Sequence, residues 1–133
     1  MTKILFVCHG NICRSPMAEF YMKDLAERAG LAGEFEILSA ATSSEELGNG
    51  VYPPVRALLE RQGIDCTGKT VRLLRASDYE AFDLLIGMDD YNLRRMQRLF
   101  GEDAAPAKTA PQFRCGFIDS HTVVDVNALP ASM

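Results

Sequence analysis

A short apolar run at the start of the chain is followed at once by a polar loop and then by a helical pattern. Residues 3–8 are almost continuously apolar, which is typical of a strand buried on both faces. Ser15 and Pro16 are expected to open a helix, with the serine as N-cap and the proline in the first turn. A strand that runs directly into a helix favours a parallel α/β fold.

The same order then repeats along the chain. Further strands are predicted over residues 34–40 and 83–88, and further helices over residues 55–62 and 89–100. Because parallel strands connect through right-handed crossovers, we expect a three-layer α/β/α fold, Rossmann-like or flavodoxin-like, around a four-stranded parallel sheet. The fourth strand would be residues 113–118, where the pattern is weak.

Length and composition restrict the class of protein. The chain has 133 residues, which suits one domain over residues 1–133, and its 47% hydrophobic and 24% charged residues are typical of a soluble globular protein. A net charge of −4 gives no reason to expect a nucleic acid partner, and no apolar run is long enough to span a membrane.

The four cysteines form no CxxC pair, so we expect neither a metal site nor a cofactor. With no secretory signal at the N-terminus, a cytoplasmic protein with free thiols is predicted.

The stretch VCHGNICRSP, residues 7–16, has the composition of an anion-binding loop. Cys8 would end the first strand, and the first amides of the following helix lack internal partners and carry partial positive charge. Gly10 is expected to let the backbone curl so that successive amides point inward, and Arg14 adds a planar fork for two phosphate oxygens. The same field favours the thiolate form of Cys8. The predicted phosphate-binding residues are His9, Gly10, Asn11, Ile12, Cys13, Arg14 and Ser15.

A nucleophilic cysteine beneath a bound tetrahedral anion predicts two-step phosphoryl transfer. Cys8 would attack phosphorus in line, and water would then hydrolyse the cysteinyl phosphate. The loop amides and Arg14 would stabilise the equatorial oxygens, so this chemistry needs no metal ion.

The motif Cys-x-Gly-Asn-x-Cys-Arg-Ser-Pro over residues 8–16 resembles that of the low-molecular-weight protein tyrosine phosphatases, which share the phosphotyrosine protein phosphatase I fold. Three further blocks are similar to segments of that family: residues 39–49, residues 63–64 and residues 83–93. Together the matching blocks extend from residue 3 to about residue 100.

The resemblance implies a role for each matching residue. It implies that Cys8 is the nucleophile and Arg14 the phosphate-binding arginine. It implies that Asn11 holds the loop in a strained shape and that Ser15 stabilises the thiolate. Cys13 matches a family cysteine that forms a reversible disulfide with the nucleophile under peroxide. Supporting polar positions behind the loop match Ser39 and Asp89.

The C-terminal region departs from the family. Family members carry an Asp-Pro near the C-terminus as the general acid, and this chain contains no Asp-Pro. Asp119 and Asp125 lie in the corresponding region without the surrounding motif, and solvated loop aspartates are the better reading of both. Residues 101–133 are therefore expected to be an atypical, poorly ordered tail, such as a truncation would leave.

Several functions remain open at this point. The leading hypothesis is hydrolysis of protein phosphotyrosine, with inorganic phosphate as product. A phosphotyrosine-binding module with little turnover is the first alternative, because the general acid is missing. Arsenate reduction is discounted because that chemistry needs two further cysteines close together after the third strand, and residues 87–91 contain none. Ile12 stands where phosphoarginine phosphatases carry threonine, which disfavours that activity. Glu45 and Glu46 stand where several relatives carry a rim aromatic, which leaves substrate preference undetermined.

Overall fold

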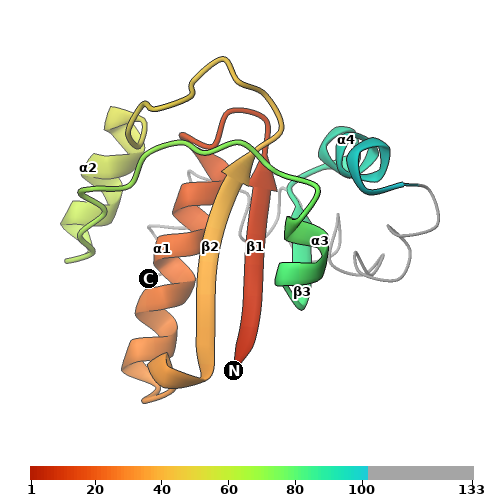
Figure 1. The fold of residues 1–133 in the computed structure, drawn as a ribbon. Coiled ribbons are helices and arrows are strands. Elements are labelled where there is room, and N and C mark those ends of the chain that lie inside the picture. The colour runs from red at the N-terminus through yellow and green to blue at the C-terminus, as the bar shows by residue number, and fades with distance from the viewer. Residues whose placement is uncertain (102–133) are drawn as a thin grey trace.

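The computed structural model describes residues 1–101, and the elements follow one another in the alternating order that the sequence predicts (Figure 1). They are β1 (Thr2–Cys8), α1 (Arg14–Arg28), the short 3-10 helix η1 (Ala32–Glu34), β2 (Phe35–Ala41), α2 (Pro53–Arg61), α3 (Asp78–Ala81), β3 (Leu84–Gly87) and α4 (Asp90–Phe100).

The described strands form one parallel sheet with the order β2-β1-β3. The chain leaves the central strand β1 for β2 on one side and later places β3 on the other, so the strand order reverses at β1. Ligands of open α/β sheets bind at such a reversal, beyond the carboxyl ends of the strands. The predicted parallel α/β fold is confirmed; three strands lie within residues 1–101, and the expected strand over residues 113–118 lies outside the described residues.

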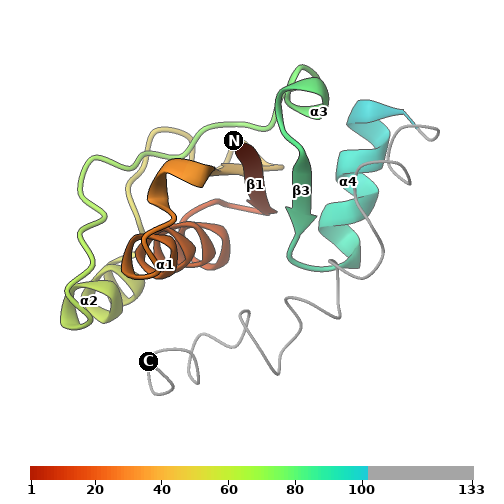
Figure 2. The ribbon, with the colours of Figure 1, turned by 90° about the horizontal axis from the view of Figure 1, so that it is seen from below.

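Alternate residues of β1 face opposite layers, and this alternation produces the three-layer arrangement. Phe6 and its neighbours on one face pack against Met22 and Ala18 of α1. Leu5 and Val7 on the other face belong to a core that includes Met96 of α4. Figure 2 shows α1 and α4 on different sides of the sheet.

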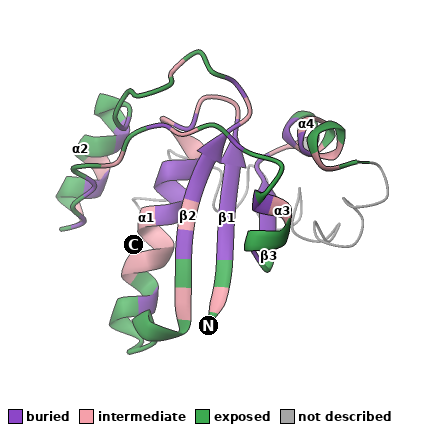
Figure 3. Ribbon diagram, viewed as in Figure 1, coloured by how far each residue is buried: buried purple, intermediate pink, exposed green. Residues whose placement is uncertain are grey.

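The residues of the central strand become more buried toward its carboxyl end. In β1 the exposed Lys3 gives way to five buried residues that end at Cys8 (Figure 3). Helix α2 lies outside α1, and a third apolar cluster around Met17, Val55 and Leu59 joins the two helices. The first functional candidate is therefore fixed by a rigid, buried strand.

The starts of the helices differ in part from expectation. Ser15 is not the N-cap of α1: Cys13 occupies that position without a side-chain bond, because the Ser15 hydroxyl is held by the preceding loop. Asp89 does cap α4, since its side chain accepts from the Asn92 amide at 2.8 Å. No helix within residues 1–101 is both long and apolar enough to cross a membrane.

Candidate active site

The loop between β1 and α1 curls around the sulfur of Cys8. Asn11 has a φ of 57° and is the one non-glycine residue among residues 1–101 in the left-handed region. Asparagine tolerates this conformation better than most residues. The expectation that Gly10 supplies the curl is wrong, because Gly10 has no positive φ and an added Cβ would lie at least 3.6 Å from the nearest atoms considered. The turn is made by Asn11.

The outward side of the loop is anchored to the segment that follows β2. Its carbonyl oxygens accept bonds from three backbone amides of that segment. No bond from the amides of Gly10, Ile12 or Cys13 to another backbone group is described within residues 1–101, and successive amides of such a loop can bind an anion. The anchoring bonds are Thr42 N to Cys8 O at 3.0 Å, Ser43 N to His9 O at 3.0 Å and Tyr52 N to Ile12 O at 2.7 Å.

Cys8 lies at the floor of this loop, where its sulfur meets two polar groups. The Asn11 amide donates to Cys8 Sγ at 3.2 Å, and Ser15 Oγ lies 3.0 Å from the same sulfur. Asn11 Nδ2 donates to Ser15 Oγ at 2.7 Å, so the serine accepts one bond and can donate its own proton to sulfur. All three residues are buried. Both contacts can place a hydrogen-bond donor on the sulfur.

Arg14 begins α1 and reaches toward the carboxyl end of β3. Its Nη1 donates to Asp89 Oδ2 at 3.2 Å, while Oδ1 of the same carboxylate caps α4. Both side chains are partly exposed, so the guanidinium is oriented by Asp89 and still accessible to an anion. The predicted neighbours Cys8, Arg14, Ser15 and Asp89 are thus brought together.

Ser39 lies in β2, and the side chains that bond to it within residues 1–101 are Glu19 and Lys69, which are not loop residues. It pairs with Phe6 across the sheet, and its hydroxyl donates to the buried carboxylate of Glu19. The Lys69 ammonium lies 3.3 Å from Glu19 Oε1 and donates to the Ser39 carbonyl at 3.0 Å. Burial lowers the pKa of Lys69, and the neighbouring Glu19 opposes that shift. Sequence reasoning missed this cluster, whose weak signal is a glutamate on the sheet-facing side of a helix.

Two side chains from different segments reach His9 at the mouth of the loop. Glu45 Oε2 lies 3.2 Å from His9 Nε2, and the Tyr91 ring centroid lies 6.4 Å from that of His9. Glu45 therefore stands at the rim, as its sequence position indicates. Tyr91 was overlooked, although it follows β3 closely and residues after parallel strands gather at the ligand-binding edge.

Cys13 lies beside the loop in an environment unlike that of Cys8. Burial and the nearby Cys8 raise the pKa of the Cys13 thiol, while Arg14 lowers it by less. Within residues 1–101, Cys8, Cys13 and Cys66 are all free thiols, and no cluster of three or more His, Cys, Asp or Glu side chains could hold a metal ion. Asp119 and Asp125, the weak candidates for the general acid, lie outside the described residues.

The fold and the loop together define a parallel α/β protein with a buried thiol at the base of the loop that joins its first strand to its first helix. The family model of the low molecular weight phosphotyrosine protein phosphatases matches residues 3–125, and the chain belongs to this family. The family model therefore matches residues beyond residue 100, whereas the sequence motifs that resemble the family end at about that residue.

Relatives from bacteria and yeast agree with this assignment. The chain is 39% identical over 101 residues to the low molecular weight protein-tyrosine-phosphatase YfkJ of Bacillus subtilis, covering 76% of this chain and 65% of the relative. It is 40% identical over 121 residues to the low molecular weight phosphotyrosine protein phosphatase of Schizosaccharomyces pombe, covering 80% of this chain and 77% of that protein. The chain thus spans slightly less than two thirds of the Bacillus relative.

Solved structures share the fold. The crystal structure of YfkJ from Bacillus subtilis superposes with a TM-score of 0.82 at 28% identity, over 99% of this chain and 89% of that one. A Drosophila arginine phosphatase superposes with a TM-score of 0.75 at 25% identity, over 98% and 90% of the two chains. Fold alone therefore does not separate phosphotyrosine from phosphoarginine as the substrate.

Proposed function

We infer that this protein hydrolyses aryl phosphomonoesters, with protein phosphotyrosine as the substrate class, through a cysteinyl-phosphate intermediate. The observation that carries this inference is the contact of Cys8 Sγ with both the Asn11 amide and the Ser15 hydroxyl. A thiol held this way at a helix N-terminus is a nucleophile, and the nest around it binds the group to be attacked.

In the first step, Cys8 Sγ attacks phosphorus from the floor of the loop. A sulfur–phosphorus bond forms and the bond to the phenolic oxygen breaks, so the electron pair leaves with that oxygen. The loop amides and the Arg14 guanidinium hold the three equatorial oxygens, where charge is spread in the transition state. Asp89 keeps the guanidinium in place through its 3.2 Å contact.

In the second step, water attacks the phosphorus of the cysteinyl phosphate. The sulfur–phosphorus bond breaks, inorganic phosphate forms, and the thiolate of Cys8 is restored. Ser15 and the Asn11 amide assist this departure because they stabilise sulfur as it regains its negative charge.

A general acid would protonate the leaving oxygen of the first step. The family's Asp-Pro is absent from the whole sequence, and this observation supports the second candidate function. In that alternative, the loop captures phosphotyrosine and turns it over slowly. The names of the relatives favour phosphotyrosine over arsenate chemistry. A cytoplasmic location stays a prediction.

The test is a time course with 4-nitrophenyl phosphate, whose leaving group needs little protonation. The parent should release nitrophenolate, and rapid acid quenching should recover phosphate on the peptide that contains Cys8. Cys8→Ser should do neither, whereas Cys66→Ala, which removes a thiol packed near α2, should do both. Turnover without Cys8 would disprove the mechanism. A phosphoarginine peptide run in parallel should be a poorer substrate than a phosphotyrosine peptide.

A further inference from the structure

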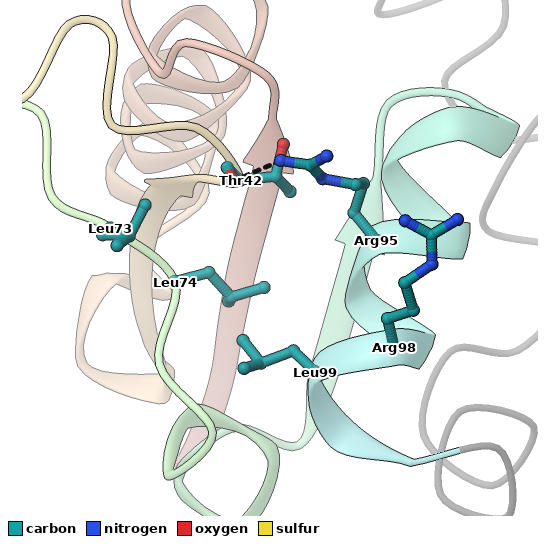
Figure 4. Close-up of a pocket in the computed structure, with 6 residues that line it drawn as sticks. All are labelled: Thr42, Leu73, Leu74, Arg95, Arg98 and Leu99. Atoms are coloured by element: carbon teal, nitrogen blue, oxygen red, sulfur yellow. Dashed lines mark hydrogen bonds between the residues drawn. The ribbon is translucent and has the colours of Figure 1, made fainter.

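A groove lies between α4 and the segment that precedes α3. It holds about 320 Å³, and Figure 4 shows Leu74 and Leu99 pointing toward each other in it, with two arginines of α4 above them. Leu73 and Leu99 are 39% and 43% exposed, so apolar surface here is open to solvent. The lining residues are Thr42, Leu73, Leu74, Arg95, Arg98 and Leu99.

This groove adjoins the phosphate-binding loop through a single residue. The Thr42 amide donates to the Cys8 carbonyl at 3.0 Å, and the Thr42 carbonyl accepts from Arg95 Nη2 at 3.4 Å (Figure 4). Thr42 thus links the loop to the groove, so residues that flank a bound phosphotyrosine can approach the groove along an extended chain, which advances about 3.3–3.6 Å per residue.

The charges in the groove are all positive. Arg95 contacts the Thr42 carbonyl and the Tyr91 ring, and neither Arg95 nor Arg98 pairs with a carboxylate described within residues 1–101. Arg72 nearby behaves differently, because Asp78 binds its guanidinium at 3.0 Å. Two guanidinium groups with no carboxylate partner among the described side chains lie above a leucine floor, an arrangement complementary to a carboxylate beside an apolar side chain.

The approach from the loop to the groove also has an aromatic wall. Tyr91 is exposed, lies beside His9 and stacks under the Arg95 guanidinium, with 5.6 Å between Cζ and the ring centroid. Its ring holds Arg95 in place by a cation–π contact. On the other flank of His9 stands Glu45, which would repel an acidic residue. The mouth is thus positive on the α4 side and negative on the side of the loop after β2.

We propose that the groove of Arg95, Arg98 and the three leucines is a recognition subsite for acidic and apolar residues that flank the phosphotyrosine of the substrate. The carboxylate binds the two arginines, and a neighbouring apolar side chain covers Leu73 and Leu99. The subsite rests on the proposed function because the phosphotyrosine anchors the peptide.

The test measures peptide binding to the Cys8→Ser protein, so it does not depend on turnover. Phosphotyrosine peptides carry Glu-Leu-Glu on the N-terminal or the C-terminal side, and each has a Gln-Leu-Gln counterpart. One of the two glutamate peptides should bind about three- to tenfold tighter than its glutamine counterpart. This ratio corresponds to the binding free energy of one or two exposed ion pairs. This preference should shrink as salt is raised from about 0.05 to 0.5 M.

Arg98→Gln should abolish the preference, and the control Arg61→Gln should keep it, since Arg61 is an exposed arginine at the end of α2 that does not line the groove. The subsite would be overturned if each glutamate peptide bound with the same affinity as its glutamine counterpart. It would also be overturned if the two arginine variants lost the preference for glutamate to the same extent. The proposed function is tested in a separate assay, which measures the turnover of 4-nitrophenyl phosphate by the protein with Cys8 intact. A preference without turnover would leave the subsite standing and remove the activity.

Discussion

Ser15 Oγ lies 3.0 Å from Cys8 Sγ, and both atoms are buried. Because the serine oxygen already accepts from Asn11 Nδ2, its proton is left for the sulfur. The first prediction is that Ser15→Ala slows alkylation of Cys8 by iodoacetate near pH 6 by about tenfold or more, the loss of one hydrogen bond to a charged group. Ser44→Ala, at an exposed position, should not change the rate. An unchanged rate in Ser15→Ala would show that the hydroxyl does not stabilise the thiolate.

Cys13 should react by a different pH profile. Burial and the nearby Cys8 raise the pKa of its thiol, so the protonated form persists until the pH passes that raised value. Peroxide should convert Cys8 to the sulfenic acid. The Cys13 thiolate then attacks the sulfur of that sulfenic acid, so a sulfur–sulfur bond forms, the sulfur–oxygen bond breaks, and hydroxide leaves and takes up a proton to become water. Disulfide closure should therefore accelerate as the pH rises, and thiols should reverse it. Digests analysed by mass spectrometry check this; Cys8 sulfinic acid without any disulfide would contradict it.

Arg14→Lys tests the shape of the cation rather than its charge. Lysine keeps the positive charge but loses the planar fork and its orientation by Asp89. The affinity for vanadate or phosphate should fall about tenfold or more, as expected for one lost charge-assisted hydrogen bond. Arg28→Lys is the matched control on the same helix, since Arg28 pairs with Asp24 far along α1. Isothermal titration calorimetry measures both. Equal affinity of Arg14→Lys and the parent would assign the phosphate contacts to the amides alone.

The buried carboxylate of Glu19 should make the fold sensitive to Lys69. Lys69→Met leaves this carboxylate with the half-buried Lys23 as its remaining cation, and loss of one partner of a buried pair costs up to about 3–5 kcal/mol of unfolding free energy. Lys23→Met should cost less, about 1 kcal/mol, because the Lys23 side chain is more exposed than that of Lys69 and its ion pair is screened by solvent. Urea denaturation measures both. The double variant Glu19→Gln, Lys69→Met should recover part of the loss, and a silent Lys69→Met would show that the pair does not stabilise the fold.

The strand and helix order could be predicted from the sequence because each segment of the fold carries its own local signal. β1 reads as a buried strand because both of its faces are covered, and the capping role of Asp89 follows from its place before a helix. The loop could be identified because Cys8, Asn11 and Arg14 lie within seven residues and strand–helix geometry brings them together. The residues of this loop could therefore be identified from their spacing in the sequence.

Contacts between distant segments were not predictable in the same way. Glu19 and Lys69 are 50 positions apart, and Arg95 and Thr42 are 53 apart, so neither pair has a signal in sequence spacing. The source of the loop's curl was misassigned to Gly10 because glycine is the usual residue for a left-handed turn. Asn11 takes that role through hydrogen bonds that only the folded loop supplies.

The last prediction concerns the missing Asp-Pro and separates a complete phosphatase from a slow one. A positioned general acid contributes about 10²–10⁴-fold to rate when the leaving oxygen needs a proton. Without one, kcat/KM for substituted phenyl phosphates should fall steeply as the pKa of the leaving phenol rises, and phosphotyrosine peptides should be slow. Asp119→Asn and Asp125→Asn should leave that dependence unchanged. A flat dependence in the parent that becomes steep in only one variant would identify that aspartate as the acid. The chain would then carry its own proton donor despite lacking the Asp-Pro motif.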